Sequence, residues 1–530
     1  MPPRARRPRA LETSGPERIV SEAWEPFGSE GVEPGLRRQV ARGLTWTVVD
    51  TWGRQVINLA VYAILARLLV PADFGVVALA GVFVALAQTL VDQGLGDALI
   101  QRREITRSHA DTAFWVAVAT GVALTVAVLV LAGPIADLLN TPGLQPILTA
   151  LSASFVLAAL SSIQIALLRR ELAFRALAIR ALLASLGGGA VGVVLALLGF
   201  GAWALVGQLL ASAAISVLAL WGLTPWRPRF SASTQSFREL FPFGIRVVGA
   251  DTLTFLSRNA DSFLIGAVLG PTPLGFYAIG HRLLEVTQVL LVNVARKVTF
   301  PAFSRLQADP PRMRSAYLSV TRISSALILP GYIGMAAVAP ELVEVVFGGG
   351  WGPSAAVASV LFLIGPVLSV QAFSGSFLNA AGHPEVVLRF RFISTVANVI
   401  GFAVAVPFGI VAVAAAFVIR GYQLLPLNLF WMRRYGGVAI GAFLAEVRGP
   451  AVATALMVAA ILATKLVIGS VTPLVLLAVE ATVGAVAFVA ALWIFDRRSL
   501  DELAALASQA LRRGPPGEAA PLPDADEVEE

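Results

Sequence analysis

The sequence has no cysteine, only three histidines and few charged residues. Without cysteine the chain can form no disulfide, no thiolate zinc site and no cysteine-bound iron–sulfur cluster. The histidines, His109, His281 and His383, lie too far apart in sequence to show metal-ligand spacing. The sequence therefore predicts no metal site and no cofactor.

Charged residues make up 14% of the chain and apolar residues 57%, a balance that excludes a soluble globular protein and a disordered one. Fourteen apolar stretches are close to the roughly 20 residues that a helix needs to cross a bilayer. We predict an all-helical polytopic membrane protein with about 14 transmembrane helices. The predicted spans are 44–69, 74–91, 112–131, 146–168, 177–198, 202–223, 243–269, 274–294, 317–338, 355–380, 390–408, 410–431, 452–468 and 473–494.

Lys and Arg are concentrated before the first span, in every second loop and after the last span. The intervening loops, such as 132–145, 270–273 and 340–354, contain neither residue. Because cytoplasmic loops carry an excess of Lys and Arg, this alternation predicts that both termini are cytoplasmic. Arg175 and Arg180 are assigned to one of these cytoplasmic loops. The net charge of +7 is spread over many loops instead of forming one patch, so no nucleic-acid partner is predicted.

A short turn sequence occurs twice, 200 residues apart, which indicates an internal duplication. The identical pairs are Leu69 and Leu269, Pro71 and Pro271, Gly75 and Gly275, and Ala78 and Ala278. A second match pairs Gly201 with Gly409. Six spans separate the copies, so both halves have one orientation and should be related by an axis along the membrane normal. The predicted organisation is a disordered basic cytoplasmic tail (1–40), an N-terminal six-helix lobe (41–225), a cytoplasmic linker (226–240), a C-terminal six-helix lobe (241–435), two extra transmembrane helices (436–496) and a cytoplasmic tail (497–530).

Several charged and amide residues lie within the predicted spans. An Arg or Asp at the centre of a span costs about 2.5–3.5 kcal/mol on insertion scales, so each should face a partner or a water-filled cavity. The first span carries Asp50, Arg54 and Asn58 at a spacing of four, on one face of the helix. The others are Arg246, Asp251, Arg258 and Asp261 in the seventh span, Arg282, Glu285 and Asn293 in the eighth, and Arg420 in the twelfth.

Two interpretations of these residues remain open. In one, Asp50 with Arg54, and Arg258 with Asp251 or Asp261, are ion pairs that only hold helices in register. In the other, Arg246, Arg282 and Arg420 have no evident carboxylate, and this surplus favours an anionic ligand, because the guanidinium fork suits phosphate oxygens. Arg246 could alternatively extend to the cytoplasmic interface.

Five segments carry a resemblance to a known family. They are LLRRELAFRALA (167–178), GFGAWALV (199–206), FGIRVVGADTLTFLSRNADSFLIGAVLGPTPLGFYAIGHRL (243–283), FPAFSRLQ (300–307) and APELVEVVFGGGWGPSA (339–355). Over about residues 40–495 the chain resembles Wzx-type bacterial polysaccharide flippases, in the branch with the colanic acid exporters, of the multidrug/oligosaccharidyl-lipid/polysaccharide (MOP) transporter superfamily, to which the MATE-type exporters also belong. The resemblance implies two six-helix lobes, alternating access, a positively charged central cavity and an undecaprenyl-pyrophosphate-linked oligosaccharide as substrate.

We therefore hypothesise that the chain is a flippase, not an enzyme, in a bacterial cytoplasmic membrane, serving exopolysaccharide, capsule or O-antigen synthesis. Its expected partners are the lipid-linked oligosaccharide and membrane lipids, with a polysaccharide polymerase and a chain-length regulator as candidate protein partners. The candidate head-group residues are Arg54, Arg258, Arg282, Arg420, Arg246, Asn58 and Asn293. Candidates for ion coupling are Asp50, Asp251, Asp261 and Glu285. The alternatives are a flippase for another pyrophosphate lipid, a MATE-type multidrug exporter and, least favoured, a membrane glycosyltransferase or polymerase.

Overall fold

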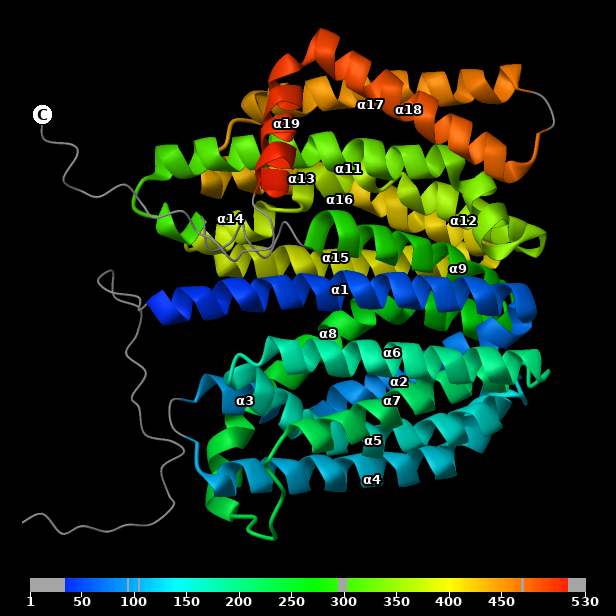
Figure 1. The fold of residues 1–530 in the computed structure, drawn as a ribbon, viewed down its shortest axis with the longest axis vertical. Coiled ribbons are helices and arrows are strands. Elements are labelled where there is room, and N and C mark those ends of the chain that lie inside the picture. The colour runs from blue at the N-terminus through cyan, green and yellow to red at the C-terminus, as the bar shows by residue number, and fades with distance from the viewer. Residues whose placement is uncertain (1–33, 93–94, 103–104, 294–302, 469–470, 513–530) are drawn as a thin grey trace, which may run out of the picture.

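The structure is a computed structural model that describes residues 34–92, 95–102, 105–293, 303–468 and 471–512. All regular secondary structure in these ranges is helical, as predicted. Most of the helices lie side by side along one common direction (Figure 1). Among the described residues, eleven helical segments are long and apolar enough to cross a membrane. The other three predicted spans fall on α1, α8 and α9, which hold most of the charged residues named above.

Over residues 34–92, 95–102 and 105–223, the N-terminal lobe has seven helices. They are α1 (Pro34–Leu68), α2 (Pro71–Asp92), α3 (Leu95–Gln101), α4 (Arg107–Leu138), α5 (Leu144–Arg170), α6 (Phe174–Leu197) and α7 (Ala202–Leu223). Consecutive helices α4 and α5, and α6 and α7, pack as hairpins, while α1 lies along α6 and α2 along α5. Small residues allow the close approach of α1 and α6, because a Cβ on Gly189 would lie 2.5 Å from Val61.

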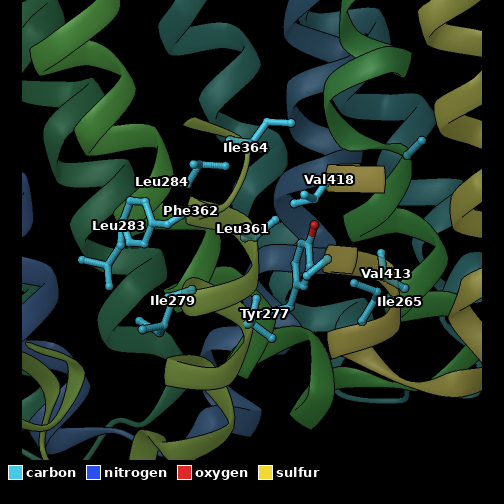
Figure 2. Close-up of a cluster of buried hydrophobic side chains, with 14 of the residues drawn as sticks. Ile265, Tyr277, Ile279, Leu283, Leu284, Leu361, Phe362, Ile364, Val413 and Val418 are labelled. Carbon is cyan, nitrogen blue, oxygen red and sulfur yellow. The ribbon is translucent and has the colours of Figure 1, made fainter. Parts of the chain in front are cut away.

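The C-terminal lobe begins with a long helix and contains one broken span. Its elements are α8 (Thr234–Val268), α9 (Pro271–Gln288), the π-helix η1 (Val289–Asn293), α11 (Pro310–Phe347), η2 (Gly349–Trp351), α12 (Gly352–Phe362), α13 (Gly365–Gln371), α14 (Ser374–Ala380), α15 (Pro384–Ala405), η3 (Val406–Phe408) and α16 (Ile410–Gly436). The buried side chains of α9, α12 and α16 form its core, with Tyr277, Leu361 and Val413 among them (Figure 2).

The two lobes meet where the duplicated turns face each other. A Cβ on Gly75 would lie 1.7 Å from the Pro271 carbonyl oxygen, and one on Gly275 would lie 1.8 Å from the Pro71 carbonyl oxygen. Only glycine permits so close an approach of two backbones. The contact is reciprocal, as two copies related by an axis between them would make it. The other duplicated turn also matches, since Gly201 and Gly409 have φ values of +55° and +96°.

Three further helices follow the lobes. α17 (Ile440–Val467) and α18 (Pro473–Phe495) form a hairpin that packs on α11. α19 (Arg497–Arg512) turns across the other helices instead of following their direction (Figure 1). Arg322 of α11, only 4% exposed, fixes α19 by donating to Glu502, with an Nε to Oε2 distance of 3.2 Å, and it also binds Glu446 of α17 at 2.8 Å. Most of the predicted C-terminal tail that the structure describes is therefore an ordered helix.

Candidate functional site

The first charged group lies on α1 of the N-terminal lobe. Arg54 and Asp50 form the expected ion pair, with 2.8 Å between Nε and Oδ1. The Arg54 side chain is nevertheless 43% exposed and that of Asp50 22%. Asn58, one turn further along α1, is half-buried. This pair is accessible, so it can still offer guanidinium N–H groups to a ligand.

A second cation, Arg180 of α6, stands beside this pair. Its Nη1 donates to the Ser216 hydroxyl of α7 at 3.0 Å, and its Nε is buried without a hydrogen-bond partner. Arg180 interacts electrostatically with both Arg54 and Asp50. Its assignment to a cytoplasmic loop is therefore wrong, because it lies inside α6 with its side chain against α1 and α7. The signal was present in the sequence, since the predicted span 177–198 contains this residue.

A cavity of about 270 Å³, with a mainly apolar wall that also carries several polar side chains, lies next to Arg180 between α2, α5 and α7. Ser216, which binds Arg180, is on its wall together with Gln88, Ser154, Ser161 and Ser162. Hydroxyl and amide groups of this kind form the hydrogen bonds that sugars need. Sequence inspection does not reveal this cavity, because its wall comes from three helices that are distant in the chain.

In the C-terminal lobe, Asp261 of α8 is buried and hydrogen-bonded. Its side chain accepts the Tyr277 hydroxyl of α9 at 2.7 Å and the backbone N–H of Ser262 at 2.7 Å. His281 Nε2 lies 4.0 Å from it. The possible pairing of Arg258 with Asp261 does not occur, because Asp261 faces α9 while the Arg258 side chain is exposed. Among the described residues Arg258 has no carboxylate partner.

Arg282 of α9 is paired, contrary to the expectation that it lacks a carboxylate. Its Nη1 donates to Glu285 at 3.1 Å, three residues along the same helix. The guanidinium also lies 5.4 Å from the ring centre of Tyr62 of α1, a cation–π contact between the lobes. Glu285 is 48% exposed. Arg282 therefore joins the lobes and leaves less positive charge free than predicted.

Arg420 of α16 has a hydroxyl partner and no ion pair within the described residues. Its Nη1 donates to Ser394 at 3.0 Å, its guanidinium lies 5.0 Å from the Phe417 ring centre, and its Nε is buried without a hydrogen bond. Arg246 and Asp251 lie on α8 and Asn293 ends η1, but their side chains are outside the described residues.

The structure thus retains a surplus of arginines without carboxylate partners, although not all of them are the predicted residues. Arg180, Arg258 and Arg420 have no carboxylate partner in the described part of the chain, whereas Arg54 and Arg282 do. Within that same part, no group of three or more His, Cys, Asp or Glu side chains is arranged to hold a metal ion. The described residues therefore present guanidinium groups without carboxylate partners in both lobes and hydroxyl groups on one cavity wall.

A comparison with protein families gives one match. The family described as "Polysaccharide biosynthesis protein" matches residues 64–356, more than half of the chain. The chain belongs to this family. The resemblance to bacterial polysaccharide exporters is confirmed by that match.

Curated relatives carry names from polysaccharide assembly. The chain is 27% identical over 361 residues to the succinoglycan biosynthesis transport protein ExoT of Rhizobium meliloti (strain 1021), covering 68% of this chain and 73% of ExoT. It is 28% identical over 362 residues to the lipopolysaccharide biosynthesis protein WzxC of Escherichia coli (strain K12), covering 68% and 74%. The teichuronic acid biosynthesis protein TuaB of Bacillus subtilis (strain 168) is 24% identical, with coverage of 66% and 73%.

Solved structures show the same fold at low identity. The lipid II flippase MurJ, in an inward closed conformation, superposes with a TM-score of 0.66 at 14% identity, covering 85% of this chain and 98% of MurJ. An inward-facing MATE multidrug transporter of the MOP superfamily gives 0.51 at 18% identity, covering 75% and 98%. These similarities confirm the predicted MATE-like arrangement of helices and say nothing about the ligand.

Proposed function

We propose that this chain flips an undecaprenyl-pyrophosphate-linked oligosaccharide across a bacterial cytoplasmic membrane by alternating access. The observation that carries the proposal is the group formed by Arg54, Asp50 and Arg180 beside the cavity that contains Ser216 and other hydroxyl groups. Asp50 pairs with Arg54 while Arg180 stands nearby without a carboxylate partner among the described residues, so the group has a net positive charge. The names of the relatives, which include transport proteins and the probable flippase Agl15 of Haloferax volcanii, support a transporter over an enzyme.

In this mechanism the two ends of the head group have different partners. The pyrophosphate binds the guanidinium groups of Arg54 and Arg180, with Arg258, Arg282 and Arg420 as further contacts during passage. Charge-assisted hydrogen bonds from Arg to phosphate oxygens are the stronger kind, and the fork can bind two oxygens at once. The sugar residues bind the hydroxyl and amide groups of the neighbouring cavity, and the polyprenyl chain stays in the lipid.

The membrane potential can supply part of the driving force. Moving one negative charge outward is worth about 2.3 kcal/mol per 100 mV when the inside is negative. A pyrophosphate carries more than one such charge, so no coupled ion is required. If an ion is exchanged, Asp50 and Glu285 are better placed than Asp261, because the first two are accessible and Asp261 is buried with two donors.

The MATE-like fold is also compatible with one rival function, the export of a cationic drug. A cationic substrate requires accessible carboxylates without partners. Among the candidate residues whose side chains the structure describes, Asp50, Asp261 and Glu285 are all engaged, whereas Arg258 and Arg420 have no ion partner there. The charge therefore favours the anionic lipid.

Replacing the guanidinium groups tests the proposal. We expect Arg54→Gln and Arg180→Gln each to reduce export about 10- to 100-fold, since a hydrogen bond to a charged group contributes about 1.5–3 kcal/mol. The measurement is the amount of lipid-linked oligosaccharide retained on the cytoplasmic face of membranes that contain each variant. Arg498→Gln, at a side chain 69% exposed on α19, is the matched control.

Two results would contradict the proposal. One is export at the wild-type rate by the Arg54→Gln and Arg180→Gln double variant when it is inserted at normal levels. The other is loss of export in the control to the same degree, which would show a general sensitivity to arginine removal.

A further inference from the structure

A buried charge cluster lies where the hairpin of α17 and α18 packs on α11 of the C-terminal lobe. Lys465 of α17 places its Nζ 2.8 Å from both carboxylate oxygens of Glu341 of α11. The same Nζ is 3.7 Å from Oε1 of Glu480 of α18. Lys465 therefore links the accessory hairpin, formed by α17 and α18, to α11 of the C-terminal lobe.

The two glutamates differ in how well they are satisfied. Glu341 accepts hydrogen bonds on both oxygens from the ammonium group. Glu480 has 0% side-chain exposure, and both of its oxygens are buried without a hydrogen-bond partner. An ionised carboxylate in such a place would have neither water nor a donor to stabilise its charge.

The net charge of the cluster also indicates that Glu480 is the group left without compensation. Two carboxylates and one ammonium give a net charge of −1 if all are ionised. The Lys465 charge is already taken up by Glu341, so the excess falls on Glu480, which a low-dielectric interior drives toward the neutral acid.

We propose that Glu341, Lys465 and Glu480 form an intramembrane binding site for a single proton, with Glu480 as the group that carries it. Binding of the proton makes the cluster neutral and keeps the hairpin of α17 and α18 against α11. The site is separate from the head-group cavity, so a test of this proton site does not depend on the proposed substrate.

In the part of the chain that the structure describes, two charged groups act on Glu480. Its electrostatic neighbours are Lys465 of α17 and Glu341 of α11. α19 contacts α18 at the other end, where Leu500 and Leu503 pack near Leu492. Lys465 lies two residues before the end of α17, so the site is nearest to the membrane face at the α17–α18 turn, which the charge pattern predicts to be external.

Carbodiimide labelling tests the site directly. Dicyclohexylcarbodiimide is lipophilic and adds to protonated carboxyl groups, so the adduct at Glu480 can be followed by peptide mass spectrometry of the full-length protein in membranes. We expect labelling of Glu480 at neutral pH that declines as the pH rises, and no adduct at this position in Glu480→Gln.

Two variants separate a proton site from a merely reactive acid. In Glu341→Gln the Lys465 ammonium is free to pair with Glu480, so labelling at neutral pH should fall at least tenfold. In Lys465→Gln the stabilising cation is lost, so labelling should persist to higher pH than in the wild type. Unchanged labelling of Glu480 in Glu341→Gln would overturn the proposal, as would protection of the wild type by sodium at constant pH.

Infrared spectroscopy gives a measurement that does not depend on access by the reagent. The wild type should show the carbonyl stretching band of a protonated carboxylic acid, and this band should be missing from Glu480→Gln with the rest of the spectrum unchanged. The same band in both proteins would also overturn the assignment.

Discussion

The two lobes have matching backbones and different charges. Gly75 and Gly275 make the same contact in opposite directions. The positions around them have diverged, because Val61, Val77 and Gly81 of the first lobe stand where the second has Asp261, Tyr277 and His281. The first lobe instead has Asp50 and Arg54 on α1, where the second has Ala250 and Thr254. Packing preserved the shared turn, while each lobe acquired its own polar groups.

The difference in charge between the lobes gives Asp261 and Asp50 separate roles. Asp261 is buried and receives two hydrogen bonds, so it stabilises the contact between α8 and α9. Asp50 is partly exposed, pairs with Arg54 and lies near Arg180, so in the proposed mechanism it adjusts the charge of the binding surface. A duplicated fold therefore does not imply a duplicated site.

The largest expected effect comes from breaking the shared contact. Gly75→Ala and Gly275→Ala should each destabilise the protein by roughly 3 kcal/mol or more, because the new Cβ meets a backbone carbonyl that cannot move aside. The melting temperature of the purified protein in detergent measures this. If the contact is symmetric, the two variants should lose similar amounts.

Gly81→Ala is the control for this experiment. It lies in the same helix as Gly75, and an added Cβ there would meet nothing within 4 Å. Its stability should be unchanged or slightly higher, since alanine favours the helix by about 1 kcal/mol. A loss in Gly81→Ala equal to that in Gly75→Ala would refute the role of the turn.

A smaller effect should separate the two aspartates. Asp261→Asn should lower the free energy of unfolding by about 1.5–3 kcal/mol, because it weakens two charge-assisted hydrogen bonds in a buried place. Asp50→Asn should cost less than about 1 kcal/mol, as is typical of accessible pairs. Thermal unfolding of both variants checks the order, and the reverse order would show that the lobes have been assigned the wrong roles.

The smallest effect concerns another contact between the lobes, which involves Glu239. In the first turns of α8, before the predicted span, Glu239 contacts His109 at 3.2 Å and also Arg102, both from the first lobe. Hydrogen bonds from His109, Gln235 and Arg102 hold the pKa of Glu239 below its ordinary value of 4.5. The stabilisation this gives is present above about pH 4.5 and is lost as the pH falls through the lower folded-state pKa.

We therefore expect acidification below pH 4.5 to weaken this contact slightly in the wild type and not in Glu239→Gln. The melting temperature, measured from pH 6 to pH 3, should fall slightly less steeply in the variant than in the wild type. Identical slopes would mean that Glu239 does not link the lobes.

Much of the fold was predictable from local patterns. Apolar length and the distribution of Arg predict membrane helices in order, and the repeated Pro and Gly predict the turn at which the lobes meet. The residues of the candidate site were only partly predictable. Asp50 and Arg54 lie on one helix at a spacing of four, so their pairing follows from helix geometry. Arg180 lies inside a predicted span, but it binds Ser216 of another helix, and no spacing in the sequence predicts that contact.

The contacts of the accessory hairpin and of α19 were likewise not predictable from spacing in the sequence. Lys465 looks like an interfacial residue in the sequence, yet it binds Glu341, 124 residues earlier. α19 looks like part of a tail, yet Arg322 binds its Glu502, 180 residues away. Contacts over such separations depend on which helices become neighbours and on how each is rotated.

The sequence by itself determined that this protein lies in a membrane and which of its stretches are apolar, because transfer into lipid depends on each residue's own chemistry. Only the tertiary structure decided which arginines keep a carboxylate and which remain available, because charge compensation depends on side chains that other helices bring within a few ångströms. That is why Arg282 is paired, Arg180 binds Ser216 on the cavity wall and Glu480 is buried without a hydrogen-bond donor.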